Sequence, residues 1–282
     1  MLQARTIGFL GAGSIAEALI HGLVAGGEVE PAQLLVTNRS NRERLADLAE
    51  RYGVRTTSSR TEVAAEADIL VVACKPKDVA ELLREVGPYT RAGQVLLSLA
   101  AGVSTGSMIP LVAQGVEVVR AMPNTSALVR DSATAFCLGA GAGETAREVS
   151  RDILGAVGQV VEVPENLMDA VTGLSGSGPA YVYLMVEALI AAGQEVGLSP
   201  ETARSLVIQT VKGAARMLAE TGEDPAVLRE RVTSPGGTTA AGLAQLRAAG
   251  FEEALMKAVA AATQRSCELG AMLTATIGAE KA

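Results

Sequence analysis

Short apolar runs alternate with longer helix-like stretches over the first 163 residues of this 282-residue chain. Parallel strands need crossovers long enough to hold a helix, so this alternation predicts a doubly wound parallel sheet. Several runs are apolar at nearly every position, which is typical of strands buried on both faces. The expected strands are Thr6–Leu10, Leu34–Asn38, Ile69–Ala73, Val95–Leu99, Val116–Ala121, Thr134–Leu138 and Gln159–Val163.

Strand signals stop after Pro164, and long Ala- and Leu-rich helices follow. Capping residues followed by proline mark helix starts at Ser199-Pro200 and Asp224-Pro225. We therefore expect an α/β domain over residues 1–163 and an all-α domain over residues 164–282. The expected helices are Ala16–Ala25 and Arg42–Tyr52 in the first domain, and Pro179–Val196, Glu201–Thr221, Ala226–Thr233, Ala240–Ala249 and Glu252–Leu273 in the second.

One helix start in the first domain has a recognisable cap. Ser40 precedes the helix expected at Arg42–Tyr52, and Glu43 follows three residues later. This spacing is typical of a capping box, in which the two side chains bond each other's backbone N–H groups. We therefore expect Ser40 to cap this helix.

Composition and charge argue against several function classes. The formal net charge is −7 and 2% of residues are aromatic, so the chain lacks the positive surface and stacking platforms of nucleic-acid-binding proteins. No apolar run approaches the roughly 20 residues of a membrane span. Cys74, Cys137 and Cys267 lie far apart, which argues against a zinc site or a disulfide framework. We expect a cytoplasmic protein.

The expected helix Pro179–Val196 is apolar around most of its circumference. A helix of this kind must be buried, and a helical domain of this size has little interior in which to bury it. We therefore expect partner subunits to cover this helix, so that the chain forms a homo-oligomer.

A glycine-rich loop joins the first expected strand to the first expected helix, with the sequence Leu10-Gly11-Ala12-Gly13-Ser14-Ile15-Ala16. In Rossmann-type domains the first glycine permits a tight turn and the second lets the backbone approach a pyrophosphate. The N–H groups of the following helix N-terminus bind the phosphates. The loop therefore predicts a Rossmann-type domain in which residues 10–15 bind a nicotinamide dinucleotide. The alternative is a tight turn without a ligand.

The end of the second expected strand indicates which dinucleotide is bound. NAD-binding domains usually place a carboxylate there for the ribose 2′-hydroxyl, but this chain has Asn38, Arg39 and Ser40. The Arg39 guanidinium can pair with a 2′-phosphate. The sequence favours NADPH, with NADH as the alternative cofactor and a solvated Arg39 as the alternative interpretation.

Three further loops follow strand ends, at the edge where open α/β sheets bind their ligands. Lys75 and Asn124 are polar groups at that edge, and they can either hold the nicotinamide ribose or carboxamide or face water. The cofactor-binding residues expected in these loops are Ala73, Lys75, Pro76, Leu99, Ala100, Ala101, Met122, Pro123 and Asn124.

Few residues are available for proton transfer. His21 is the only histidine, and it lies about two helical turns beyond the glycine loop. An alcohol dehydrogenase needs a group to remove a hydroxyl proton, whereas a protonated C=N substrate already carries its proton and chiefly needs orientation. The sequence therefore favours a C=N substrate, although Lys75 remains a candidate base. No metal site is expected.

Two unusual glycine-rich stretches precede expected helices of the second domain, at residues 173–181 and 232–239. In the second stretch, bare N–H groups backed by a helix dipole can hold a carboxylate. The Thr239 hydroxyl can also bond a nearby nitrogen atom. The alternative interpretation is an ordinary turn between helices with a capped second helix.

These segments together resemble the pyrroline-5-carboxylate reductase family, whose members catalyse the last step of proline biosynthesis. The resemblance covers nearly the whole chain. It is most specific over residues 225–246, which include Val232-Thr233-Ser234, Gly236-Gly237 and Thr239. The run DAVTGLSGSGPAY from Asp169 to Tyr181 is nearly as characteristic.

The resemblance implies an NAD(P)H-dependent oxidoreductase that acts on a C=N bond. The substrate would be the cyclic imine L-1-pyrroline-5-carboxylate and the product L-proline, with NADPH as cofactor. The substrate carboxylate would bind the backbone N–H groups of Ser234, Gly237, Thr238 and Thr239. The Thr239 hydroxyl would bond the ring nitrogen and orient the imine, which makes Thr239 the expected catalytic residue.

The family also implies how subunits assemble. Residues 1–163 would bind NADP, and residues 164–282 would bind the substrate and form a dimer. Such dimers often assemble further into a pentamer of dimers. The active site would lie between the Rossmann-type domain of one subunit and the helical domain of its partner.

Two rival functions remain open at the level of sequence. β-Hydroxyacid dehydrogenases share this architecture, but they usually carry a lysine on the first long helix after the sheet. No lysine lies between Lys77 and Lys212, which argues against that reading. The other rival is a non-catalytic NADP-binding module that acts as a redox sensor or scaffold.

Overall fold

The computed structural model describes residues 2–279 and confirms the expected doubly wound sheet followed by helices. Packing divides the chain into two compact units. The first consists of Met1–Ser177 together with Ala260–Ala282, and the second is Gly178–Val259. The chain thus leaves the first unit and returns to it.

A single sheet forms the centre of the first unit. Its strands are β1 (Ile7–Leu10), β2 (Leu34–Thr37), β3 (Arg55–Thr57), β4 (Ile69–Val72), β5 (Val95–Ser98), β6 (Glu117–Met122), β7 (Ser132–Leu138) and β8 (Gly158–Glu162). Their order is β3-β2-β1-β4-β5-β6-β7-β8, and β6 and β7 form the antiparallel pair. The strand order reverses between β1 and β4, which is the place where doubly wound sheets bind their ligands.

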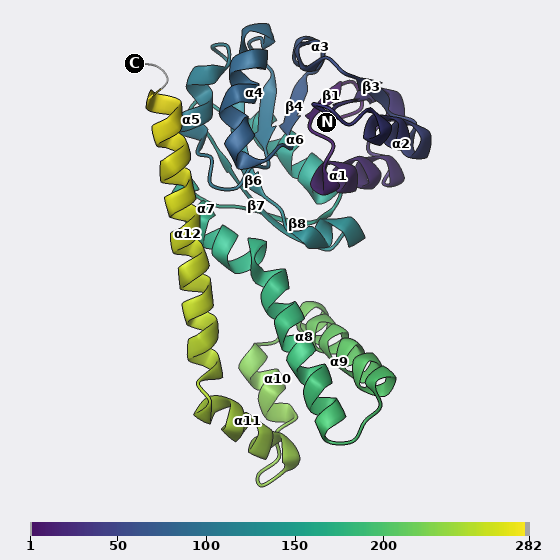
Figure 1. The fold of residues 1–282 in the computed structure, drawn as a ribbon, viewed down its shortest axis with the longest axis vertical. Coiled ribbons are helices and arrows are strands. Elements are labelled where there is room, and N and C mark those ends of the chain that lie inside the picture. The colour runs from purple at the N-terminus through teal and green to yellow at the C-terminus, as the bar shows by residue number, and fades with distance from the viewer. Residues whose placement is uncertain (1, 280–282) are drawn as a thin grey trace. The chain divides into compact units, whose positions relative to one another are not determined.

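Helices cover both faces of this sheet (Figure 1). Alternate side chains of a strand point to opposite faces, so Phe9 of β1 joins one buried apolar cluster and Leu10 joins the other. The first cluster includes residues of α1 (Ser14–Ala25), α2 (Arg42–Tyr52) and α6 (Glu144–Gly155), and the second includes residues of α3 (Arg60–Glu66), α4 (Val79–Val86) and α5 (Thr105–Met108).

The expected strands are present with ends shifted by at most two residues, but β3 was not expected from the sequence. Arg55 and Thr56 are exposed and Thr57 is half-buried, so β3 lacks the apolar pattern that marks the other strands. It pairs only with β2 in the described structure and lies at the edge of the sheet. Burial on both faces is therefore not required of it.

The expected cap of α2 is wrong by one residue. The side chain of Asn41, not Ser40, accepts the backbone N–H of Arg44 at 2.8 Å. Asn38 causes the shift, because its Oδ1 accepts the N–H groups of Ser40 (3.2 Å) and Asn41 (3.1 Å). This turn places Asn41 at the helix start.

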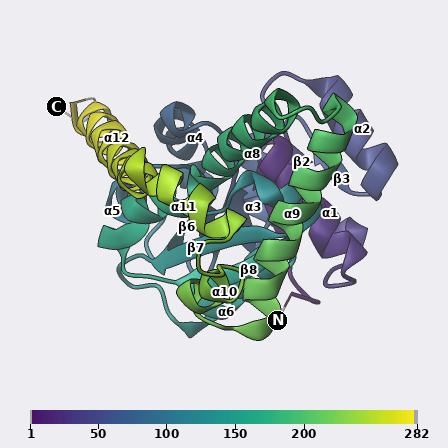
Figure 2. The ribbon, with the colours of Figure 1, turned by 90° about the horizontal axis from the view of Figure 1, so that it is seen from below.

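The second unit is helical. It contains α8 (Gly178–Glu195), α9 (Pro200–Thr221), α10 (Pro225–Arg231), α11 (Thr238–Ala248) and the first part of α12 (Phe251–Ala279). Helices α8 and α9 run side by side (Figures 1 and 2), and a Cβ on Gly193 would lie 3.0 Å from the Cβ of Ala203. The absence of a side chain at Gly193 therefore lets the two helices approach closely.

Helix α8 shows no buried residue within the described chain, although its sequence is strongly apolar. Tyr183 is 59% exposed and Leu184 is 67% exposed. Such a surface is typical of one that another subunit covers. None of the helices within residues 2–279 is long and apolar enough to cross a membrane.

The segment after β8 and the end of α12 both pack within the first unit. Met168 of α7 (Met168–Val171) is buried with Ala135 and Cys137. Asp169 pairs with the buried Arg120 at 3.0 Å and accepts a hydrogen bond from Ser266 of α12 at 2.8 Å. The functional division expected between residues 163 and 164 stays a prediction, because packing in the first unit extends beyond it.

Gly8 of β1 provides a test of the packing between the sheet and α3. A Cβ at this position would lie 2.5 Å from Val63 Cγ1 and 2.8 Å from Ala67 Cβ. We expect Gly8→Ala to lower the free energy of unfolding by about 1–3 kcal/mol through overpacking. The cost should shrink in a Val63→Ala background, because the closest atom is then absent. Urea unfolding at one fixed protein concentration measures the free energy of unfolding that Gly8→Ala costs in each background. Equal costs in the two backgrounds would contradict this explanation.

Candidate active site

A cavity of about 480 Å³ opens at the carboxyl ends of β1, β2 and β4. This is the point of strand reversal, and the glycine loop expected to bind a cofactor lies here. Among the residues expected to bind it, those that line the cavity are Leu10, Gly11, Ala12, Gly13, Asn38, Arg39, Ser40, Ala73 and Lys75.

The glycine loop passes very close to the end of β4. Gly11 has a φ of +126°, and a Cβ there would lie 2.5 Å from the carbonyl oxygen of Ala73. Its N–H donates to the carbonyl oxygen of Thr37 at 3.1 Å. Only glycine adopts this conformation without strain, so the tight turn requires Gly11.

Gly13 meets a different environment. Apart from its own residue, its two chain neighbours and the backbone of α1, a Cβ at Gly13 would have no atom of the described chain within 4 Å. Gly13 is the N-cap of α1, and no side chain of the described residues accepts a bond from the first N–H groups of the helix. The start of α1 therefore presents uncovered donors and the positive end of the helix dipole to the cavity.

Arg44 of α2 bonds the backbone of the glycine loop. Its Nε donates to the carbonyl oxygen of Ala12 at 3.1 Å, and it also pairs with Glu17 in the first turn of α1. Burial raises the pKa of Glu17, but bonds from Arg44 and Tyr52 outweigh burial and hold that pKa below its usual value. Arg44 and Arg51 balance the Glu17 charge, so the carboxylate does not cancel the positive helix end.

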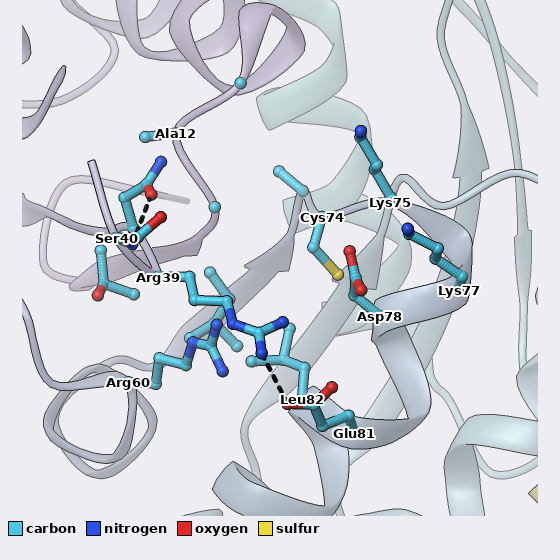
Figure 3. A pocket seen from close by; sticks show the side chains of 16 residues that line it. Ala12, Arg39, Ser40, Arg60, Cys74, Lys75, Lys77, Asp78, Glu81 and Leu82 are labelled. Carbon is cyan, nitrogen blue, oxygen red and sulfur yellow. Dashed lines mark hydrogen bonds and ion pairs between the residues drawn. The ribbon is translucent and has the colours of Figure 1, made fainter.

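The cavity is also lined by residues that were not expected from the sequence, among them Glu81. Figure 3 shows Arg39 beside Glu81, and their nearest charged atoms lie 3.5 Å apart. Because both side chains are more than half exposed, a solvated Arg39 and an Arg39 that pairs with a phosphate both stay open interpretations. The other missed residues are Thr37, Arg60, Cys74, Lys77, Asp78 and Leu82. Recognising β3 as a strand would have pointed to Arg60, since the loop after it reaches the same sheet edge.

Cys74 lines the cavity but is not a suitable nucleophile. Burial, with a smaller contribution from the charge of nearby Asp78, raises the pKa of its thiol to about 11. The thiol is therefore protonated at neutral pH. Within residues 2–279, no three His, Cys, Asp or Glu side chains gather as metal ligands.

A second, more apolar cavity of about 600 Å³ also lies within the first unit. Lys75 lines both cavities, and Pro76 and Ala101 of the expected cofactor residues line this one. The rest of its wall consists of Lys77, Gly102, Thr172, Ser177 and residues of α12. The segment after β4 therefore borders both the more polar cavity and the more apolar one, and Lys75 and Lys77 lie where they meet.

The other expected cofactor residues line neither cavity. Ser14 and Ile15 begin α1, and Leu99 and Ala100 follow β5. Met122 ends β6, and Pro123 and Asn124 follow it. Whether these residues contact a cofactor stays a prediction.

Residues at the end of β6 and just after it contact the glycine-rich run at residues 173–181. Asn124 Nδ2 donates to the carbonyl oxygen of Ser175 at 3.1 Å, and its Oδ1 accepts the N–H of Ser126 at 3.0 Å. A Cβ on Gly176 would lie 2.6 Å from Met122 Cε. Ser175 and Gly176 belong to a π-helical turn, Thr172–Gly176. Such turns are frequent at functional sites.

The residues expected to bind the substrate lie together in the second unit, at the start of α11. Ser234, Thr238 and Thr239 are exposed, and Gly237 is the N-cap without a side-chain cap among the described residues. The Gly237 N–H donates to the carbonyl oxygen of Ser234 at 3.0 Å. The first N–H used within the helix is that of Ala241, which donates to the carbonyl oxygen of Gly237 at 3.1 Å, so the N–H groups of Thr238 and Thr239 are among those left without a partner in the helix.

Comparison with known proteins shows extended similarity. A family model described as pyrroline-5-carboxylate reductase dimerisation matches residues 165–269. A second model, described as NADP oxidoreductase coenzyme F420-dependent, matches residues 6–102. Pyrroline-5-carboxylate reductase 2 of Bacillus subtilis (strain 168) is 42% identical over 265 residues, which cover 94% of this chain and 95% of that protein.

Solved structures show the same similarity. A pyrroline-5-carboxylate reductase from Coxiella burnetii has a TM-score of 0.89 and 38% identity, and covers 94% of this chain and 98% of that one. A Plasmodium falciparum pyrroline carboxylate reductase with NADP bound has a TM-score of 0.85 and 32% identity, and covers 96% of this chain and 100% of that one.

The two loop glycines provide a test that separates ligand binding from folding. Gly13→Ala adds a methyl group in open space at a φ of −75°, so we expect the stability to change by less than about 0.5 kcal/mol. The methyl group should block the close approach of a pyrophosphate and raise the Kd for NADPH by about tenfold or more.

Gly11→Ala is the matched comparison, because the added methyl would meet the Ala73 carbonyl oxygen and the φ would remain positive. We expect this variant to lose stability as well as binding. Thermal unfolding and NADPH fluorescence titration measure the two effects. Normal binding by a stable Gly13→Ala variant would show that no phosphate approaches this loop.

Proposed function

The chain belongs to the pyrroline-5-carboxylate reductase family, and on that premise we propose that it reduces L-1-pyrroline-5-carboxylate to L-proline with NADPH. The observation that carries this proposal is the open glycine loop of the first unit, which lies at the switch point of the sheet. A chain that kept the fold but had lost the function would not need this space to stay open.

The residues around the cavity fit a phosphorylated dinucleotide. The start of α1 offers uncapped N–H groups within the described chain, and Gly13 leaves room for a pyrophosphate. The Oγ1 of Thr37 is buried without a hydrogen-bond partner among the described residues. Arg39, Arg60 and the lysines of the loop after β4 add positive charge. The cavity thus supplies both backbone donors and cations for phosphate groups.

The proposed chemistry asks little of the protein. When bound, NADPH supplies a hydride to the C=N carbon, and the protonated ring nitrogen takes up the electron pair of that bond. We place the substrate carboxylate at the start of α11, on the N–H groups of Thr238 and Thr239 with Ser234 and Gly237 beside them. The Thr239 hydroxyl holds the ring nitrogen and so fixes the face of the imine.

The scarcity of acid–base groups agrees with this reaction. The single histidine, His21, lies in α1 and is not part of either cavity. Cys74 keeps its proton because burial raises its pKa to about 11. Reduction of a protonated imine needs no general base to remove a proton from the substrate. We also place the enzyme in the cytoplasm.

A direct assay tests the proposed function. The intact protein should oxidise NADPH when L-1-pyrroline-5-carboxylate is added, and it should show no hydroxyacid oxidation with NADP⁺. Thr239→Val keeps the shape of the side chain but removes the hydroxyl, so kcat/KM should fall by about tenfold or more. Thr239→Ser is the control, since it keeps the hydroxyl and should retain most of the activity.

Two results would count against the proposal. Turnover of hydroxyacids in place of the imine would identify a different dehydrogenase. Binding of NADPH without turnover of either substrate would leave a non-catalytic binding module. A Thr239→Val variant as active as Thr239→Ser would remove Thr239 from its proposed role while leaving the function intact.

The helical part of the chain supports self-association, because residues 165–269 match the dimerisation model of the family. We further propose that the dimer forms through the apolar surface of α8 and that dimers assemble into a decamer. The exposed Val182, Tyr183 and Leu184 are the apolar residues that such an interface would cover.

Assembly can be measured by sedimentation at micromolar concentration. We expect the wild-type chain to sediment as a dimer or as a multiple of dimers. Leu184→Glu places a charge on a side chain that is 67% exposed in the single chain, so it should weaken assembly without disturbing a monomer core. Glu187→Gln on the same helix is the control. A folded wild-type monomer would contradict the proposal.

A further inference from the structure

Two arginines from different loops line the same cavity. Arg39 follows β2, and Arg60 is the first residue of α3, just after β3. Figure 3 shows both guanidinium groups pointing toward the part of the cavity where Glu81 lies. Lys75 and Lys77 are drawn at the other end, near Cys74 and Asp78. The cavity therefore has a doubly cationic corner beyond the end of β2.

Each of these arginines is paired with a carboxylate of α4. Arg39 Nη2 lies 3.5 Å from Glu81 Oε1, and Arg60 Nη1 lies 2.6 Å from Glu85 Oε2. Glu81 and Glu85 are four residues apart and so lie on the same face of the helix. One helix face thus contacts both cations.

The two pairs differ in how firmly they hold. The Arg60 side chain is 18% exposed and has a short contact to Glu85, so it is held in place. The Arg39 and Glu81 side chains are 63% and 62% exposed, and their contact is long. An exposed pair of this kind is worth little in free energy. An incoming dianion can therefore take Arg39 from Glu81, while Arg60 stays where it is.

The charges at this corner also affect which nucleotide is favoured. A guanidinium has five N–H donors, so Arg60 can keep its bond to Glu85 and still bind an anion in the cavity. Glu81 lines the cavity and carries a negative charge. It repels a phosphate group but can accept a hydrogen bond from a ribose hydroxyl. Arg60 and Glu81 therefore act in opposite directions on the choice between a 2′-phosphate and a 2′-hydroxyl.

We propose that Arg60 and Arg39 together bind the 2′-phosphate of NADPH, and that Glu81 limits the preference for NADPH over NADH. This inference rests on the proposed function, because it concerns the cofactor of that reaction. It adds a second cation from the loop after β3 and a residue that opposes the cation pair. Arg60 and Glu81 are thus specificity residues for the cofactor.

Nucleotide binding without turnover tests the role of Arg60. The Kd values of NADPH and NADH are measured by reduced-nicotinamide fluorescence with no imine present. Arg60→Gln should raise the Kd for NADPH by about tenfold or more, because a charge-assisted bond is lost. The Kd for NADH should stay within about twofold of the wild-type value. Arg55→Gln is the matched control: Arg55 also pairs with a carboxylate, that of Glu66, but lies outside the cavity lining.

Glu81→Gln should have the opposite effect. Removal of its charge frees Arg39 and ends the repulsion, so the Kd for NADPH should fall by about threefold, as expected for an exposed charge. The Kd for NADH should stay the same or rise, so that the preference for NADPH increases. Glu66→Gln is the control, since it removes an equivalent surface charge outside the cavity.

Failure of the inference can be told apart from failure of the proposed function. Calorimetric titration with adenosine 2′,5′-bisphosphate and with 5′-AMP measures the affinity for the adenosine half of the cofactor alone. Wild-type protein that binds neither these ligands nor NADPH would overturn the proposed cofactor. Wild-type protein that prefers the bisphosphate, with the same preference in Arg60→Gln, would overturn the inference alone. An equal loss of NADPH and NADH binding in Arg60→Gln would also overturn it, since that indicates a structural role.

Discussion

The close approach of Gly11 to the end of β4 is the constraint on which the cavity depends. A Cβ there would lie 2.5 Å from the Ala73 carbonyl oxygen, so the loop can follow this path only without a side chain. Because the loop stays tight, α1 begins directly beside the ends of β2 and β4. The uncovered N–H groups of α1 and the cations of three neighbouring loops then face one space. The proposed reaction depends on that arrangement, because the cofactor would bind there.

Most of the fold could be predicted because burial leaves a clear pattern in the sequence. Strands such as Ile69–Val72 are buried at every position and therefore read as uninterrupted apolar runs. The edge strand Arg55–Thr57 has no such requirement, and its polar residues concealed it. Because β3 was not predicted, Arg60, which follows it and lines the cavity, was not predicted as a site residue either. The substrate turn was found through its resemblance to a family, since glycine-rich turns alone are common.

Other parts of the site depend on contacts that no local pattern encodes. Glu81 lies on α4, far along the chain from Arg39, and nothing in the sequence indicates that the two form an ion pair. Asn124 was expected near a cofactor because it follows a strand end. In the structure its amide is bonded to Ser175 and Ser126, and a contact with a cofactor stays a prediction. Sequence position located the correct edge of the sheet, but it did not tell which side chains face the cavity and which support the backbone.

The return of α12 to the first unit determines when, during synthesis, that unit can complete its packing. Residues 178–259 form their own compact unit, while the segment from Ala260 onward packs with residues that were synthesised first. Asp169 receives its hydrogen bond from Ser266, and the carbonyl oxygen of Gly102 lies against Gly270. Domains generally fold in order as the chain emerges from the ribosome. Here the nucleotide-binding unit, although it begins the chain, completes its packing only after the last helix has been translated.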